Sequence, residues 1–320
     1  MLQKIRRRLL VAGALAAAGL PVAKNANAAQ DGKLTIALVL KSLADPFAVA
    51  MAGGAQNYQK HYASQFDLTV RGTATETDTF AQTRIVDELI GARTNAIVLA
   101  STDSRALIPV VARGINAGVI VISIDNPLDE ASQDAAGIFV PFVGPDNRRG
   151  AAMVGKYLAG KLKPGDEVGI IEGVSADRNA QQRTTGCQDA MNAAGIRIVA
   201  IQPGDWEYGK SKEAASAMLS EHPRIRALMC GNDNMAMGAV EAVHNARRTG
   251  RVYVTGYNNI DAIGPLLNDG RILATMDQFA ERQAAFGVDV ALKALIERRK
   301  QADLSRLIET PLQLVTSENH

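Results

Sequence analysis

The chain has 320 residues, of which 47% are hydrophobic, 21% charged and 4% aromatic, and its formal net charge is +2. This composition is typical of a globular protein of about two domains. No basic stripe indicates nucleic-acid binding, and no segment after residue 28 is apolar enough to cross a membrane.

The first 28 residues have the pattern of an export signal. A basic segment precedes an apolar stretch over residues 9–20, which is shorter than the roughly 20 residues that span a bilayer. The sequence Ala-Asn-Ala at 26–28 predicts cleavage after Ala28 and a periplasmic location. The pair Arg6-Arg7 leaves both the general secretory and the twin-arginine route open. Without the five Lys and Arg residues of this leader, the chain has 30 basic and 33 acidic residues, a net charge of −3.

Apolar, β-branched segments alternate with amphipathic segments in the first half of the chain. We predict strands at 34–40, 66–72, 95–100 and 119–124, and helices at 78–93 and 104–118. After about residue 143 the pattern repeats, with strands predicted at 166–173, 196–202, 225–230 and 251–257. Strands separated by helices predict parallel sheets that are covered on both faces. The predicted fold class is therefore α/β, with two doubly wound parallel-sheet lobes.

Polar and aromatic residues follow the predicted strands, where open α/β sheets bind ligands. The stretches are KSLADPFAVA (41–50), SIDNP (123–127), GVSADRNAQQR (173–183), PGDWEYG (203–209), CGNDNMAMGA (230–239), GYNNIDA (256–262) and ATMDQFA (274–280). They hold carboxylates, carboxamides, a guanidinium and aromatic rings, but neither a nucleophile with its base nor a cluster of metal ligands. The sequence therefore predicts a binding protein without enzymatic activity, cofactor or metal.

Two features could indicate other chemistry. The stretch GAAMVGKY (150–157) comes close to a phosphate-binding loop, but Tyr157 replaces the hydroxyl residue that would hold Mg²⁺, and the spacing favours a helix interior. Cys187 and Cys230 fit no metal motif, and the sequence leaves open whether they form a disulfide or are two buried thiols.

Several stretches resemble the periplasmic binding proteins of the ribose-binding family, which are the receptors of ABC sugar importers. The resemblance rests on IALVLKSLADPFAVAMAGGAQ (36–56), the IDN after the fourth strand, QQRTTG (181–186), GNDNMAMGA (231–239) and VTGYNNID (254–261). It covers nearly the whole chain after the leader and implies two lobes, joined by three crossings, that close over a sugar by a hinge. The implied lobes are residues 29–143 with 280–307, and residues 144–279 with 308–320.

The resemblance also implies a set of ligand contacts. Phe47 and Trp206 match aromatic residues that lie against the two faces of a sugar ring. Asp125 matches a carboxylate that accepts from two sugar hydroxyls, and Arg183 matches a guanidinium that donates to them. Lys41 ends the first strand, where some hexose binders of the family have a contacting lysine.

The carboxamides complete this set. Asn232 and Gln278 match residues that donate and accept at once, so we expect Asn232 to face the ligand and the neighbouring Asp233 to cap the following helix. Asp45 lies where ribose binders have Asn.

The sequence departs from the pattern of ribose binders at three further positions. Ala48 replaces a second aromatic residue, Asn126 replaces an Arg, and Asn258 replaces an Asp. These departures put ribose itself in doubt and leave a neutral polyhydroxylated ligand.

The resemblance implies a monomeric receptor that delivers a neutral monosaccharide or polyol to the permease and ATPase subunits of an ABC importer. The formal charges of Lys41 and Arg183 balance those of Asp45 and Asp125, which disfavours an anionic ligand. The alternative is a sugar sensor that presents its closed form to a chemoreceptor or signalling kinase. A sugar-sensing transcriptional regulator would need an N-terminal DNA-binding module, where this chain has its leader.

Overall fold

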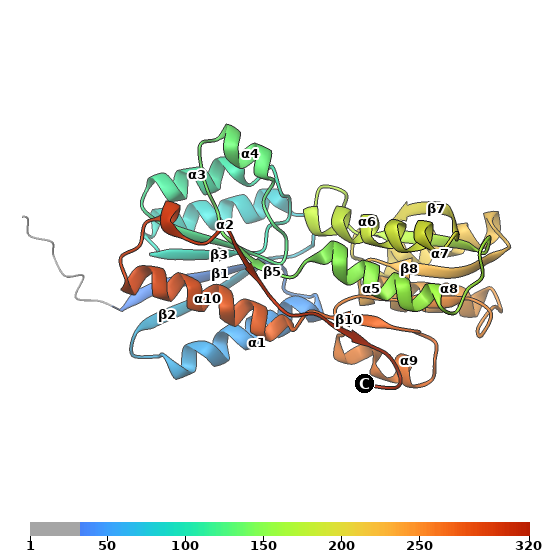
Figure 1. Cartoon of the computed structure of the whole chain (residues 1–320). Coiled ribbons are helices and arrows are strands. Elements are labelled where there is room, and N and C mark those ends of the chain that lie inside the picture. Colours follow the sequence, from blue (N-terminus) through green and yellow to red (C-terminus); the bar gives the residue numbers. More distant parts are fainter. Residues whose placement is uncertain (1–32) are drawn as a thin grey trace, which may run out of the picture. The chain divides into compact units, whose positions relative to one another are not determined.

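The first lobe is built on a six-stranded sheet with the strand order β11-β5-β4-β3-β1-β2, in which all neighbouring strands are parallel (Figure 1). The computed structural model describes residues 33–320, so the predicted leader and its cleavage site lie outside the described residues. The strands are β1 (Leu34–Ser42), β2 (Phe66–Thr73), β3 (Ala96–Leu99), β4 (Ile120–Ile124), β5 (Phe142–Gly144) and β11 (Leu307–Glu309).

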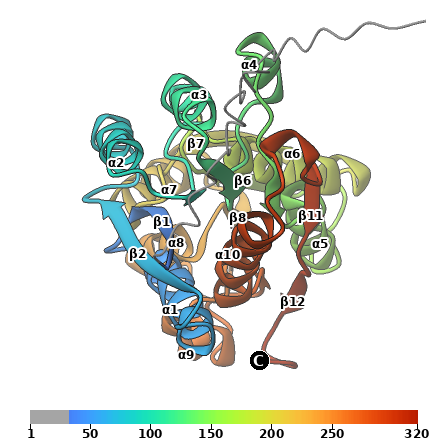
Figure 2. The same cartoon turned by 90° about the vertical axis from the view of Figure 1, so that its left-hand side faces the viewer.

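Helices cover both faces of this sheet, which explains why its strands are continuously apolar. Figure 2 shows α2 (Thr79–Gly91) and α3 (Ile108–Asn116) on one side of the strands, and α1 (Pro46–His61) and α10 (Ala280–Ile296) on the other. Alternate residues of β1 enter the two cores: Ile36 and Leu38 pack with the α1 and α10 layer, whereas Ala37 and Val39 pack with the α2 and α3 layer. A short helix, α4 (Glu130–Ala135), follows β4.

The second lobe has a four-stranded parallel sheet with the order β7-β6-β8-β9. Its strands are β6 (Glu167–Glu172), β7 (Arg197–Pro203), β8 (Ile225–Cys230) and β9 (Tyr253–Thr255). Helices α5 (Asn147–Ala159) and α6 (Arg178–Ala193) pack against one another, as do α7 (Tyr208–Glu221) and α8 (Asp233–Asn245). The small α9 (Gly264–Asn268) follows the 3-10 turn Asp261–Ile263, and a second 3-10 turn spans Gln301–Asp303.

Three segments connect the lobes: the chain crosses after β5, after β10 (Thr275–Asp277) and after β11. β10 pairs antiparallel with β12 (Gln313–Val315). Gly144 and Ile308–Glu309, which we expected in the second lobe, belong to the sheet of the first, because β11 pairs with β5 as far as Glu309 and Gly144.

The strands predicted from apolar runs are present, with ends that differ by at most two residues. The stretch 150–157 lies inside α5, as its spacing predicted. Helix α3 begins at Ile108 instead of residue 104, with Pro109 in its first turn. Cys187 and Cys230 are buried free thiols. Within residues 33–320, no helix combines the length and apolarity that a membrane span needs.

Candidate functional site

A small cavity lies between the lobes, at the carboxyl ends of both sheets. It is lined from the first lobe by Lys41, Asp45, Phe47, Glu76 and Asp125, and from the second by Asn179, Arg183, Trp206, Asn232 and Asn258. Eight of the ten predicted ligand contacts thus come together here. The strand ends position them, because both parallel sheets direct their carboxyl edges to this space.

Lys41 is the last residue but one of β1 and is 5% exposed. Its Nζ lies 2.6 Å from Asp177 Oδ2, 3.9 Å from Asp125 Oδ2 and 5.5 Å from the centroid of the Trp206 ring. Burial lowers the pKa of this amine, but the carboxylates of Asp177 and Asp125 outweigh burial and raise it above its ordinary value. Lys41 is therefore a fixed cation at the cavity wall.

Asp125 follows β4 directly and has a left-handed backbone, with a φ of 58°. Short polar residues tolerate this conformation, and it turns the chain sharply at the end of the strand. Asn179 Nδ2 donates to Asp125 Oδ1 at 3.3 Å from the other lobe. The carboxylate is 6% exposed and so lies in the wall of the cavity.

Two aromatic residues contribute apolar surface to the cavity. Phe47 is in the first turn of α1 and 6% exposed, and Trp206 lies between β7 and α7 and is 4% exposed. The indole lies directly over Gly173, where a Cβ would overlap the ring, so glycine at this position makes room for it. Flat aromatic faces of this kind pack against the C–H groups of a sugar ring.

Arg183 is on α6 and 3% exposed. Its Nε donates to Asn147 Oδ1 at 2.8 Å, and its NH1 donates to the carbonyl of Gly231 at 3.0 Å. Its Cζ lies 3.9 Å from the centroid of the Tyr257 ring. These contacts are within the second lobe, so Asp125 takes its hydrogen bond from Asn179 instead of from Arg183.

The strand-to-helix turn at Asn232 differs from the prediction. Asn232, not Asp233, caps α8: its Oδ1 accepts from the backbone of Met235 at 2.9 Å. Asp233 is fully buried and accepts from Thr275 Oγ1 at 2.8 Å and from the backbone of Ile260 at 3.0 Å. The cap uses only the oxygen of Asn232, and its side chain still lines the cavity.

Two predicted contacts lie behind the cavity wall. Asn126 is fully buried, and its Nδ2 donates to the carbonyl of Ser101 at 2.9 Å and to Asp177 Oδ1 at 3.1 Å. Gln278 Nε2 donates to Asn258 Oδ1 at 2.7 Å. Both residues therefore hold neighbouring parts of the site in place instead of facing the cavity.

Comparison with known proteins agrees with this architecture. The model of the periplasmic binding protein domain matches residues 36–299. The chain belongs to the periplasmic binding protein family. Members of this family are solute-binding receptors of ABC importers and not enzymes, and they act in the periplasm.

Relatives of this periplasmic binding protein include proteins that are named for the sugars they bind. It is 52% identical to the D-ribose/D-allose-binding protein of Pseudomonas aeruginosa, over 97% of this chain and 98% of that one. It is 58% identical to an ABC transporter solute-binding protein of Burkholderia multivorans, and the two structures superpose with a TM-score of 0.87. The match covers 89% of this chain and 100% of that one. An unknown ligand in that structure is interpreted as alpha-D-erythrofuranose. A solute-binding protein of Actinobacillus succinogenes with bound D-allose is 31% identical, with a TM-score of 0.83, over 90% of this chain and 99% of that one.

The sequence did not single out two residues that line the cavity of this periplasmic binding protein, Glu76 and Asn179. Glu76 lies between β2 and α2, and its Oε1 accepts from the backbone of Ser42 at 3.2 Å. Burial raises the pKa of Glu76 to about 8, although Lys41 opposes this. The carboxyl is therefore largely neutral at pH 7, and the charges of the other lining residues still balance. Glu76 lies after β2, and Asn179 lies in the first turn of α6, the helix that follows β6. Their place after a strand is the signal that could have found them.

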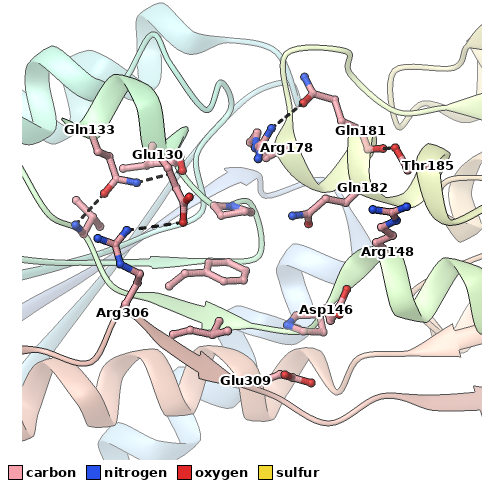
Figure 3. A pocket seen from close by; sticks show the side chains of 16 residues that line it. Glu130, Gln133, Asp146, Arg148, Arg178, Gln181, Gln182, Thr185, Arg306 and Glu309 are labelled. Carbon is pink, nitrogen blue, oxygen red and sulfur yellow. Dashed lines mark hydrogen bonds and ion pairs between the residues drawn. The ribbon is translucent and has the colours of Figure 1, made fainter. Parts of the chain in front are cut away.

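A second, larger and open groove runs beside the connecting segments (Figure 3). Its arginines have protein partners: Arg306 lies 3.7 Å from Glu130. Arg178 donates to Gln181, and Arg148 donates to Asp189, which lies outside the groove. Because these groups are satisfied by protein partners, we assign ligand binding to the smaller cavity, where polar groups from both lobes converge. Within residues 33–320, no group of three His, Cys, Asp or Glu residues could hold a metal ion.

Proposed function

We propose that this periplasmic binding protein captures a neutral monosaccharide between its lobes, with D-allose and D-ribose as the first candidates, and that linear or cyclic polyols are its other ligand class. The observation that carries the proposal is the composition of the cavity, in which carboxylates, carboxamides and two cations surround a space bounded by Phe47 and Trp206. Sugar hydroxyls both donate and accept, and sugar rings present apolar faces to aromatic residues. The names of the relatives, which bind D-ribose and D-allose, support the same class.

Charge supports a neutral ligand over an anionic one. The charges of Lys41 and Arg183 balance those of Asp45 and Asp125 in the cavity wall, and Glu76 adds a carboxyl that becomes anionic at higher pH. An anionic ligand would add charge to a cavity that already holds an excess of carboxyl groups. A hydroxyl that lacks its partner in such a site costs about 1–3 kcal/mol, so the arrangement of polar groups selects among stereoisomers.

The ten lining residues and the hinge between the lobes are part of this proposal. Because the wall of the cavity comes from both lobes, a ligand that touches all of it stabilises the closed arrangement. The permease of the ABC importer then recognises the closed form of a monomeric receptor, and the ATPase subunits drive uptake.

A ligand screen tests the proposal. Trp206 is the single tryptophan of the chain and lines the cavity, so bound ligand should change its fluorescence. The panel contains D-allose, D-ribose, other pentoses and hexoses, inositols and linear polyols, with amino acids and organic acids as controls. A ligand at 100 times its Kd should stabilise the fold by about 2.7 kcal/mol. Thermal shifts with amino acids or organic acids, and none with sugars or polyols, would contradict the proposal.

A further inference from the structure

Asp177 accepts hydrogen bonds from three side chains that come from both lobes. Its Oδ2 accepts from Lys41 Nζ at 2.6 Å and from Trp206 Nε1 at 2.8 Å, and its Oδ1 accepts from Asn126 Nδ2 at 3.1 Å. Lys41 lies in β1 and Asn126 follows β4, both in the first lobe, whereas Asp177 and Trp206 belong to the second. The carboxylate is fully buried, so these bonds are shielded from solvent.

The position of Asp177 makes these contacts unexpected. It immediately precedes α6, where an aspartate ordinarily accepts from the first backbone N–H groups of the helix. Here the side chain makes no such cap, although Asp45, Asp78, Asp129 and Asp146 cap their own helices in the same chain. The carboxylate points instead to Lys41 and Trp206, and two of its three donors are in the other lobe.

We propose that Asp177 is a positioning residue that orients Lys41 and Trp206 and holds the lobes together after a ligand has entered. The proposal rests on the proposed function, because it places the ligand in the cavity that Lys41 and Trp206 line. Among residues 33–320, Asp177 is not one of those that line the cavity. It lies behind Lys41 and Trp206, which do line it.

The consequence concerns the rate of ligand release. The bond from Trp206 stays within the second lobe, so it can persist when the lobes separate. The bonds from Lys41 and Asn126 connect the lobes, and opening must break both, including a charge-assisted bond of 2.6 Å. Asp177 therefore slows opening and release more than it affects the first encounter with ligand.

The test measures association and dissociation rates by stopped-flow fluorescence of Trp206, with the sugar that gives the largest thermal shift. Asp177→Asn keeps the size of the side chain but replaces a charged acceptor with an amide. We expect dissociation to become at least about tenfold faster while association changes less than about threefold, as for other changes in one interface. The exposed Asp189→Asn on the same helix is the matched control and should leave both rates unchanged.

In Asp177→Asn the buried cation of Lys41 loses its charged partner, and this loss alone could destabilise the fold. The double variant Lys41→Met/Asp177→Asn removes the cation as well and therefore controls for such a defect. If the two residues act as a pair, the double variant should release ligand no faster than Lys41→Met alone. Equal dissociation rates in Asp177→Asn and the wild type, or additive effects in the double variant, would overturn the inference. If the wild type binds no sugar or polyol, the proposed function fails instead.

Discussion

Asn234 and Asp45 connect the first turns of two helices that belong to different lobes. Asn234 Nδ2, on α8, donates to Asp45 Oδ2 at 2.5 Å, while Asp45 Oδ1 accepts from the backbone of Phe47 at 2.8 Å. One carboxylate thus caps α1 and holds the opposite lobe at the rim of the cavity.

This contact predicts that Asn234→Ala weakens sugar binding without a comparable loss of stability in the ligand-free protein. A hydrogen bond to a charged group contributes about 1.5–3 kcal/mol, so affinity should fall by about tenfold or more if the bond forms only when the lobes meet. Asn234→Asp should bind sugar more weakly still, because it places a second carboxylate against that of Asp45. Calorimetric titration measures both, and unchanged affinity in Asn234→Ala would show that the contact has no part in binding.

Arg183→Ala should reduce both affinity and stability. The guanidinium lines the cavity, and it also donates to Asn147 and to the carbonyl of Gly231. Each buried acceptor left without a donor costs about 1–3 kcal/mol. Arg183→Lys keeps the charge but loses the planar donor pattern, so it should recover stability better than affinity. Chemical denaturation and titration separate the two effects; wild-type affinity in Arg183→Ala would contradict the assignment.

Glu76 should make stability depend on pH. Burial raises its pKa to about 8, from about 4.5 in the unfolded chain, so its neutral form is favoured in the folded protein. The stabilisation is fully present below about pH 4.5 and is lost progressively as pH rises through 8. Glu76→Gln cannot ionise. The difference in unfolding free energy between variant and wild type should therefore shift in favour of the variant between pH 5 and 9, and a constant difference would contradict the prediction.

Asp233 should be important for folding and not for ligand contact. It is fully buried and accepts from Thr275 and from the backbone of Ile260. Asp233→Ala leaves both donors unpaired, and each unpaired donor costs about 1–3 kcal/mol, so a loss of about 2–6 kcal/mol is expected. Denaturant unfolding measures it. Sugar affinity of the folded fraction should remain close to that of the wild type, and a loss confined to affinity would place Asp233 in the site.

The strands could be predicted because both faces of each sheet are buried, which leaves long apolar runs in the sequence. The short strands β5, β10, β11 and β12 were not predicted; each has three residues, as has β9, which lies within the predicted strand 251–257. Most cavity residues could be predicted from their place after a strand and from the family resemblance. Asp177 could not: an aspartate before a helix is ordinarily a cap, and its actual partners are 136 and 29 residues away in the chain. The cap of α8 was assigned to Asp233 instead of Asn232 for a related reason, because both residue types can cap a helix.

The first lobe also depends on the order in which the chain is made. Its strand β5 pairs with β11, and Phe142 lies opposite Leu307. Helix α10 packs against α1 so closely that a Cβ on Gly54 would overlap the backbone of Glu281. During synthesis, β1, β3 and β4 emerge long before the helix that covers one of their faces. The lobe cannot complete its core until residue 309 has left the ribosome, because its last strand ends there. Such late, long-range closure slows the folding of the first lobe, because contacts between segments far apart in the sequence form last.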